Sequence, residues 1–327
     1  MDDDAALGAA ADDILSADFL LVAVGAGFSA DSGLPVYNDI ANVAAYKAMD
    51  LEYHDLCDAH WAHANLPLFY GFWGDCFNMY RDSSGHAGYE ILREWKLRLC
   101  RKRTDLASLL PDKSSLDVTT EPFFVYSSNV DAHFRRMFAQ NEVYEIHGTT
   151  ERWQCAGLSD GVPPCPGTWL LPPDYRFPVD KTSMLSHVSS PPPPFLECPK
   201  CHGPARPNVL MFGDTSWLPN HQDEARYVAW EAAVEEALMR DRTKRLVVLE
   251  IGCGLRVPSV RMECEMVARD IQCKTQSTDQ VRHIRINPTD IDGDDDTASP
   301  VLRQIQSTGL AALMAIAKHM DTAIATM

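Results

Sequence analysis

The chain alternates short, almost uninterrupted apolar runs with longer stretches in which apolar residues recur at helical spacing. A short apolar run bounded by turn residues is typical of a strand that is buried on both faces of a sheet. Strands that alternate with helices indicate an α/β fold with an open and mostly parallel sheet. Strands are expected at 19–24, 123–126, 143–146, 209–212, 245–251 and 281–286, and helices at 5–16, 223–239, 258–268 and 302–320.

Residues 37–116 follow a mostly helical pattern that is dense in aromatic side chains. Aromatic residues at helical spacing usually belong to a core, so we expect these side chains to pack against one another. The aromatic positions are Tyr46, Tyr53, Trp61, Phe69, Tyr70, Phe72, Trp73, Phe77 and Tyr80.

Residues 149–208 break both patterns, because they hold many prolines, including the run 191–194, and four cysteines. Proline is excluded from helix interiors and central strands, so this stretch is predicted to form an irregular, smaller lobe. Residues 290–296 are predicted to form a solvated acidic loop. The chain then divides into a first strand and turn at 1–36, a helical insertion at 37–118, a return to the sheet at 119–148, the Pro-rich module at 149–208 and the rest of the sheet at 209–327.

Polar clusters follow four of the expected strands. They are Gly25-Ala26-Gly27 with Ser29, Asn129 with Asp131, His147, and the turn Gly252-Cys253-Gly254. Ligands of open parallel sheets bind beyond the carboxyl ends of the strands, so the four clusters predict one ligand site. A small-residue turn before a helix also leaves backbone N–H groups available for a pyrophosphate.

Each of these motifs has a structural interpretation as well. The Gly25–Gly27 turn suits any tight connection between a strand and a helix, and Asn129 or Asp131 can cap a helix. An isolated histidine such as His147 is often a satisfied structural residue. The order of the motifs taken together, rather than any one of them, favours the ligand site.

A second candidate site lies in the Pro-rich module. Cys198-Pro199-Lys200-Cys201 is a zinc-knuckle pattern, and Cys155 and Cys165 precede it with nine residues between them. Two thiolates on one tight turn reach a tetrahedral ion without strain, and a lobe with little core gains most from such a link. We predict one structural Zn²⁺ bound by Cys155, Cys165, Cys198 and Cys201, with no open position for substrate. A redox Cys-x-x-Cys or unligated thiols are the alternative.

Composition narrows the function classes. The formal net charge is -17 over 327 residues, which argues against direct binding of nucleic acid through phosphate neutralisation. No apolar run is long enough to cross a membrane, and no basic region precedes an apolar stretch at the N-terminus. Ten cysteines are too sparse for a disulfide scaffold. We therefore expect an intracellular protein, cytoplasmic or nuclear and not secreted.

The motifs resemble those of the sirtuin family, which comprises NAD-dependent protein deacylases and ADP-ribosyltransferases. Six segments carry the resemblance in family order over about residues 18 to 290: Gly25-Ala26-Gly27-Phe28-Ser29 with Ser32-Gly33-Leu34-Pro35, Ser128-Asn129-Val130-Asp131, Ile146-His147-Gly148, Phe212-Gly213-Asp214, Gly252-Cys253-Gly254-Leu255, and Ile286-Asn287. The resemblance implies a Rossmann-like domain with a smaller zinc-binding and helical lobe. It also implies NAD, Zn²⁺ and an acylated-lysine protein or peptide substrate.

The resemblance implies a role for each matching position. The turn Gly25-Ala26-Gly27 would hold the NAD pyrophosphate, with Ser29, Tyr37 and Ser128 nearby. Asn129 and Asp131 would line the nicotinamide and ribose pocket, and His147 would be the general base, a role that suits imidazole. Gly252, Cys253, Gly254 and Asn287 would contact the adenosine half. Phe212 and Gly213 would line the groove for the substrate peptide.

The chain departs from the family pattern at three places. Where the family has Asp-Phe-Arg, this chain has Val36-Tyr37-Asn38. Ser128 stands in place of the family's Gln, and Cys253-Gly254 stands in place of its Thr-Ser. A tyrosine at this position, Tyr37, resembles the pattern of divergent microbial sirtuins that are linked to macrodomain operons. Some of those sirtuins transfer ADP-ribose. Three functions follow: a protein-lysine deacylase, a protein mono-ADP-ribosyltransferase that modifies a protein acceptor, and an NAD-binding sensor without turnover.

Overall fold

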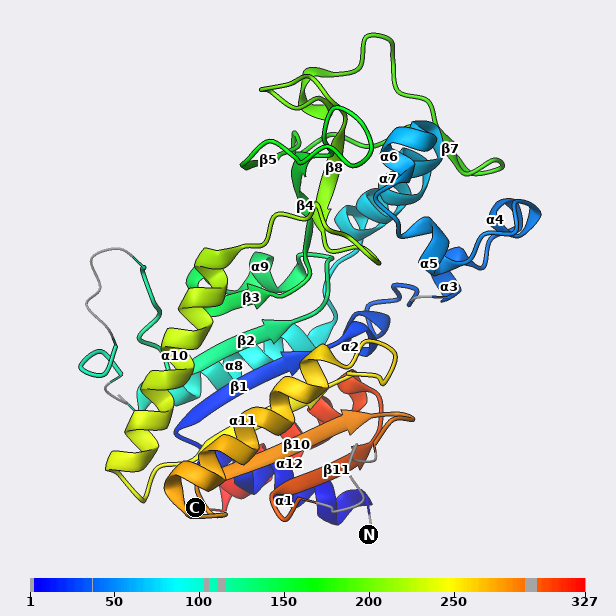
Figure 1. Ribbon diagram of the computed structural model, residues 1–327. Helices are drawn as coiled ribbons and strands as arrows, with labels where there is room; N and C mark the ends of the chain where they lie inside the picture. The colour runs from blue at the N-terminus through cyan, green and yellow to red at the C-terminus, as the bar shows by residue number, and fades with distance from the viewer. Residues whose placement is uncertain (1–2, 37, 103–105, 111–115, 292–298, 327) are drawn as a thin grey trace.

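The centre of the protein is a sheet of six strands in which each neighbouring pair is parallel (Figure 1). The computed structural model describes residues 3–36, 38–102, 106–110, 116–291 and 299–326. The strand order is β11 (Leu302–Gln306), β10 (Val281–Asn287), β9 (Leu246–Ile251), β1 (Phe19–Val24), β2 (Phe123–Ser127) and β3 (Val143–Glu145). The predicted α/β fold is confirmed.

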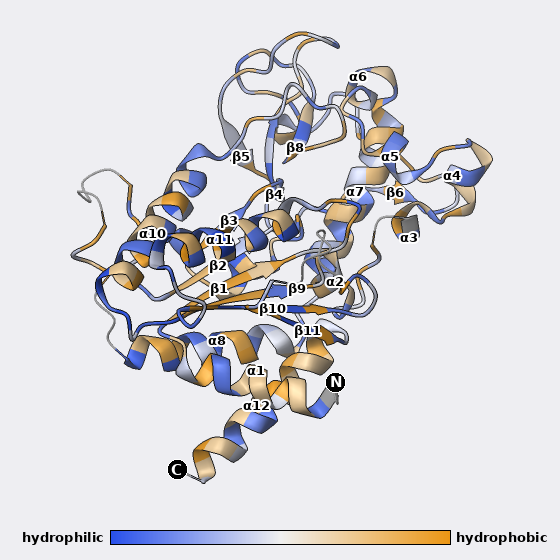
Figure 2. Cartoon of the chain, turned by 60° about the horizontal axis from the view of Figure 1, so that its bottom comes forward, coloured by the Kyte–Doolittle hydropathy of each residue, from blue (hydrophilic) through white to orange (hydrophobic). Residues whose placement is uncertain are grey.

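The middle strand β1 shows why these apolar runs form strands. Leu20, Val22 and Val24 join one hydrophobic core, whereas the alternating residues join the core on the other face. A wholly apolar strand requires cover on both faces. Helices α1 (Asp3–Ser16), α8 (Ala87–Arg101) and α12 (Gly309–Ala325) cover the first face, and α10 (His221–Arg240) and α11 (Ser259–Thr275) cover the second (Figure 2).

Two predictions about the second half of the chain are wrong. The helix expected over residues 302–320 begins only at Gly309, because Thr308 accepts a hydrogen bond from the Ala311 N–H and caps it, while residues 302–306 form the edge strand β11. The strand expected over 209–212 ends at Val209, and it belongs to a small antiparallel sheet as β8 (Ala205–Val209). The acidic loop predicted at 290–296 lies mostly outside the described residues.

Residues 37–116 are mostly helical, as predicted, but the helices pack in two different places. Most of the aromatic side chains form a core of the small lobe, centred on α7 (Leu66–Asp82). The following helix α8 instead packs against the parallel sheet through Leu92 and Trp95. The shorter helices of this stretch are α3 (Asn38–Ala41), α4 (Ala44–Ala48), α5 (Tyr53–Leu56) and α6 (Trp61–Ala64).

The Pro-rich module is more regular than expected, because it contains short antiparallel strands. Strand β4 (Gly148–Cys155) lies between β5 (Thr168–Leu170) and β8, and β6 (Val179–Asp180) pairs with β7 (Leu185–Ser186). Pro207 lies within β8, which is an edge strand where a missing N–H is tolerated. The remaining elements are α2 (Ala26–Ala30), α9 (His133–Met137) and two 3₁₀ turns, Gln140–Glu142 and Pro194–Leu196. None of the helices in the described ranges is both long and apolar enough to span a bilayer.

Candidate active site

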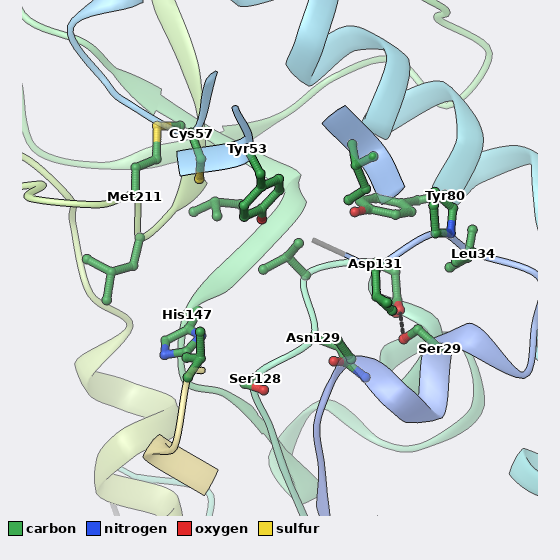
Figure 3. A pocket seen from close by; sticks show the side chains of 18 of the residues that line it. Ser29, Leu34, Tyr53, Cys57, Tyr80, Ser128, Asn129, Asp131, His147 and Met211 are labelled. Atoms are coloured by element: carbon green, nitrogen blue, oxygen red, sulfur yellow. Dashed lines mark hydrogen bonds between the residues drawn. The ribbon is translucent and has the colours of Figure 1, made fainter. Parts of the chain in front are cut away.

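The polar motifs follow strands whose carboxyl ends meet at one edge of the parallel sheet. A single cavity there is lined by seven of the predicted residues, namely Ala26, Ser29, Ser128, Asn129, Asp131, His147 and Phe212. His147 lies on one side of this cavity, and the pair formed by Ser29 and Asp131 lies on the other (Figure 3). The structure therefore brings together residues that are more than 100 positions apart in the chain.

Asp131 is fixed by two hydrogen bonds within the protein. Its Oδ2 accepts from the Ser29 hydroxyl at 2.5 Å, and its Oδ1 accepts from the His133 N–H at 2.9 Å. Asp131 is a buried residue at the wall of the cavity, so these two donors hold its carboxylate in one orientation. Asn129 is tied in a similar way, because its Nδ2 donates to the Gly25 carbonyl at 3.0 Å. Both side chains are thus pre-oriented at the mouth of the glycine turn.

The backbone of His147 is held by the residue after β8 and by the glycine that begins β4. Its carbonyl accepts from the Leu210 N–H at 2.9 Å, and Gly148 begins β4 at a φ of +77°. A Cβ on Gly148 would lie 1.9 Å from the Asn208 carbonyl oxygen, so glycine is required here. Burial lowers the pKa of the imidazole, against a weaker opposing effect of the Ser128 backbone. The ring is therefore neutral at neutral pH, as a general base must be.

The glycine turn has a structural role that the sequence did not reveal. The Gly27 N–H donates to the Gly252 carbonyl at 3.0 Å, and the Gly25 N–H donates to the Ile251 carbonyl at 3.0 Å. A Cβ on Gly27 would stand 2.7 Å from the Gly252 Cα. The two glycine turns therefore cross in backbone contact. Ala26 is the first residue of α2 and lines the cavity, so its N–H has no acceptor within the helix and is the donor we assign to a ligand.

The predicted adenosine-side residues do not line this cavity. The Cys253 side chain belongs to the core between the sheet and helices α10 and α11. Burial raises the pKa of its thiol well above its usual range. Asn287 is 5% exposed, and its Nδ2 donates to the Cys253 carbonyl at 3.0 Å. Gly252 and Gly254 belong to the same turn, so contact with a ligand there would come from the backbone. Tyr37 lies outside the described residues, and Gly213 follows Phe212 at a φ of +65° without lining the cavity.

The rest of the cavity wall was not predicted as part of a site. It is mostly apolar and comes from the segment after α2, the helical insertion, the loops after β2 and β9, and the end of β8 with the residues that follow it. The additional lining residues are Leu34, Pro35, Val36, Ile40, Tyr53, Cys57, Trp73, Tyr80, Val130, Val209, Leu210, Met211 and Val257. Burial raises the pKa of the Cys57 thiol to about 12, so this cysteine is no nucleophile at neutral pH. The aromatic pattern at residues 53–80 was the one available signal, and it also describes a core.

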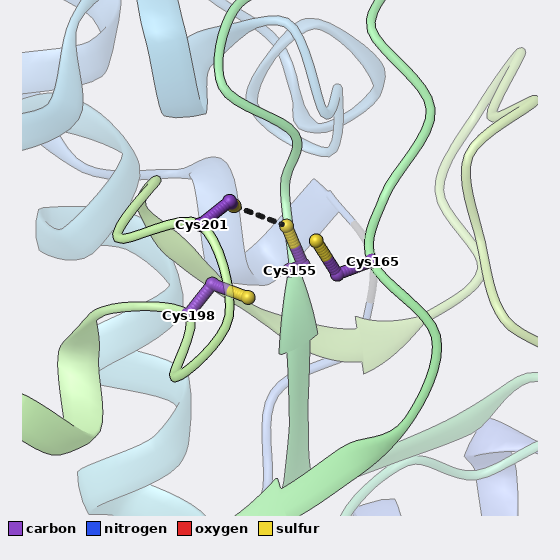
Figure 4. A group of neighbouring side chains, drawn as sticks. All are labelled: Cys155, Cys165, Cys198 and Cys201. Atoms are coloured by element: carbon purple, nitrogen blue, oxygen red, sulfur yellow. Dashed lines mark hydrogen bonds between the residues drawn. The ribbon is translucent and has the colours of Figure 1, made fainter.

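The four cysteines predicted to bind zinc do come together (Figure 4). The sulfur atoms of Cys155, Cys165, Cys198 and Cys201 all lie within 4.8 Å of one another, and the first and last are 3.5 Å apart. Four thiolates bound to one tetrahedral Zn²⁺ at ~2.3 Å stand about 3.8 Å apart, so the group fits this ion. Burial would raise the pKa of Cys198, but the N–H groups of Cys201 and Lys200 lower it to about 7, toward the thiolate.

A second buried group, Glu250, Cys264 and His283, has ligand types that could hold a metal. Its carboxylate is already occupied, since it accepts from the Arg285 Nε at 2.9 Å and contacts the His283 Nε2 at 2.8 Å. A guanidinium thus takes the place that a cation would need, and this cluster is an internal ion-pair network across β9 and β10.

Comparisons with known proteins agree with the motifs and the fold. No family model matches the chain. A curated relative, NAD-dependent protein deacylase 2 of Corynebacterium efficiens, is 28% identical over 249 residues, which are 74% of this chain and 74% of the relative.

Solved structures extend the likeness over nearly the whole chain. A complex of a Sir2 homologue with NAD aligns at a TM-score of 0.56 and 16% identity, over 96% of this chain and 94% of that one. A mutant Sir2 homologue bound to 2'-O-acetyl ADP ribose aligns at 0.55 and 15% identity, over 96% of both chains. Sir2Tm bound to a propionylated peptide aligns at 0.50 and 15% identity, over 94% and 95%. The Sir2-like α/β fold and the predicted resemblance to sirtuins are therefore confirmed.

Proposed function

We propose that this protein is an NAD-dependent protein-lysine deacylase of the sirtuin type, which releases nicotinamide from NAD and moves the acyl group of a substrate lysine to ADP-ribose. The observation that carries the proposal is the cavity in which His147 lies opposite the fixed carboxylate of Asp131. The sequence similarity to a curated NAD-dependent protein deacylase supports the same activity.

The residues fit NAD on observations of this cavity. Ala26 lines the cavity as the first residue of α2, and the N–H groups of a helix start suit an anionic pyrophosphate. Asp131 can accept from a carboxamide while its other contacts hold it in place. When bound, NAD would supply a ribose carbon that becomes electrophilic as nicotinamide leaves.

His147 would act on the ribose side of the cavity. Its neutral ring can take a proton from a ribose hydroxyl at a ring nitrogen, which lets that oxygen accept the acyl group. The apolar wall formed by residues such as Met211 and Tyr53 would exclude water from the acyl chain. Phe212, which is 47% exposed beside the cavity, would contact the peptide that carries the lysine.

We propose that the four-cysteine cluster binds a structural zinc ion, because its sulfur spacing fits that ion. We propose an intracellular site of action, since the ten cysteines are free thiols and four of them suit a metal site. Direct contact with nucleic acid or membrane is not part of the proposal.

The decisive experiment incubates the protein with NAD, with and without a panel of acyl-lysine peptides, and measures nicotinamide, deacylated peptide and protein-bound ADP-ribose together. A deacylase releases nicotinamide only with an acyl peptide. His147→Ala should lower that release about 10²- to 10⁴-fold, the usual contribution of a general base. His221→Ala, an exposed histidine at the start of α10, should leave it unchanged.

Other results would favour the two alternatives. Labelling of a protein acceptor without any acyl peptide would identify a mono-ADP-ribosyltransferase. NAD binding by calorimetry without nicotinamide release would identify a sensor. An unchanged rate in His147→Ala would contradict the assigned base.

A further inference from the structure

A second hollow lies between the large sheet and the small lobe, and arginine side chains line it. They are Arg81 at the end of α7, Arg135 and Arg136 in α9, Arg152 in β4 and Arg176 after β5. Glu151 is the one acidic residue that the described chain contributes to its lining. The lining is thus positively charged, although the formal net charge of the whole molecule is -17. We name these five arginines and the hollow that they line the arginine groove.

Two of the arginines form a fixed floor. Arg81 donates to the Glu151 carboxylate at 2.9 and 2.7 Å and to the Pro172 carbonyl at 2.7 Å. Arg135 donates to Glu145 at 2.6 Å and also contacts Asp223. Its Nη1 is buried and has no hydrogen-bond partner among the described residues. The floor is therefore rigid, and one of its donors is unused.

The rim carries charge that the protein leaves unbalanced. Arg136 donates to the backbone carbonyls of Ser83 and Tyr80, which bear no net charge, and its one carboxylate contact is 3.8 Å from Glu151, which Arg81 already binds. Arg152 makes a long contact of 3.5 Å to the Thr168 hydroxyl, and the described residues offer it no carboxylate. The five guanidinium groups of the groove share the carboxylates of Asp82, Glu145, Glu151 and Asp223, so positive charge is in excess.

We propose that the arginine groove binds an acidic segment of a partner protein. Guanidinium groups pair with carboxylates through two parallel N–H···O bonds. The groove is open to solvent, and the exposed side chains of Leu170 and Pro173 offer apolar contact to an extended chain. An acidic segment would be repelled by most of this acidic molecule and attracted here, which also fixes where it docks.

The arginine groove adjoins the catalytic cavity along the chain. Ala132 and Thr149 line it, and they follow Asp131 and His147 by one and two residues. The backbone positions of Thr149 and His147 are therefore within about 7.6 Å of each other. The two surfaces are therefore built on neighbouring residues of the same two segments.

The test measures binding of a fluorescein-labelled peptide of alternating Glu and Ser by anisotropy, so it needs no turnover and is independent of the proposed deacylase function. We expect measurable binding that weakens with added salt. The double variant Arg136→Gln, Arg152→Gln should raise the Kd about three- to tenfold, as the loss of two partly exposed ion pairs predicts. Arg269→Gln, which removes the same charge from an exposed position on α11, should change the Kd less than twofold.

Several outcomes would overturn the proposal. They are equal binding of a peptide with Gln in place of Glu, an equal loss in Arg269→Gln, and full displacement by inorganic phosphate at the molar concentration of the peptide, which would indicate a site for a small oxyanion. Thermal unfolding of each variant excludes a loss of fold. If the double variant unfolds, Arg176→Gln, whose side chain is exposed on the rim, replaces it with the same expectation of weaker binding.

Discussion

The burial of His147 determines how the proposed activity should depend on pH. Burial lowers the pKa of its imidazole below the ordinary value of 6.5. A general base acts in its neutral form, so activity is lost as falling pH approaches and passes that shifted pKa. We therefore expect kcat/KM to reach half of its plateau value at a pH below about 6.5. A half-maximal value at pH 7 or above would show that another group controls the rate.

Ala132 occupies a backbone conformation that disfavours it. Its φ is +62°, in the left-handed region, where a Cβ costs about 1 kcal/mol and glycine has no such penalty. Ala132→Gly should raise the free energy of unfolding by about 0.5 kcal/mol, measured by urea denaturation. Ala232→Gly, at an exposed position inside α10, should lower it by about 1 kcal/mol. Equal destabilisation by both changes would contradict the strain at residue 132.

At the scale of the elements, the crossing of the two glycine turns joins β1 to β9. A Cβ on Gly27 would meet backbone atoms of Gly252 at 2.7 and 3.0 Å, and backbone cannot move aside as a side chain can. Gly27→Ala should therefore destabilise the protein by about 1–3 kcal/mol, the usual cost of overpacking, and weaken NAD binding. Urea denaturation and calorimetry with NAD would measure the two effects.

Gly33 provides the matched control for that prediction. Its φ is +78°, but a Cβ there would meet nothing within 4 Å. Gly33→Ala should cost only the backbone term, about 1 kcal/mol. If Gly27→Ala were no more damaging than Gly33→Ala, the turns would not need to be in contact.

The sequence predicts best the strands that are buried on both faces of the sheet. Strand β1 is apolar throughout, and β9 is apolar except for Glu250, because helices cover both faces of the sheet; the sequence therefore predicts both strands correctly. The edge strand β11 has only Ile305 buried, so its few apolar residues merge with the pattern of α12. Local periodicity cannot separate a short edge strand from the helix that follows it.

The candidate site shows the same limit. The polar motifs could be located because each follows a strand. The apolar wall could not, since Trp73 and Tyr80 belong to a buried core and also line the cavity. The pairing of the Gly27 N–H with Gly252 depends on a contact across 225 positions, which no local pattern records.

For the whole molecule, the cysteine cluster brings three separate segments of the small lobe together at one point. Cys155 ends β4, Cys165 lies in the loop before β5, and Cys198 and Cys201 form the knuckle before β8. The same strand β4 begins at Gly148, directly after His147. The fold of the small lobe and the position of the proposed base are therefore coupled through one strand.

Loss of zinc should then affect both the lobe and the activity. We expect about one zinc per chain by metal analysis, and Cys201→Ser should reduce it and lower Tm by about 10 °C or more, because metal binding contributes directly to folding. Hydrogen exchange should increase in β4 and β5 while amides of β1 and β2 stay protected, and nicotinamide release should fall with the loss of β4. Cys273→Ser, an exposed thiol outside the cluster, should change none of these. Two results would contradict a zinc ion that stabilises only the small lobe. They are full zinc content in Cys201→Ser and an equal loss of hydrogen-exchange protection in β1.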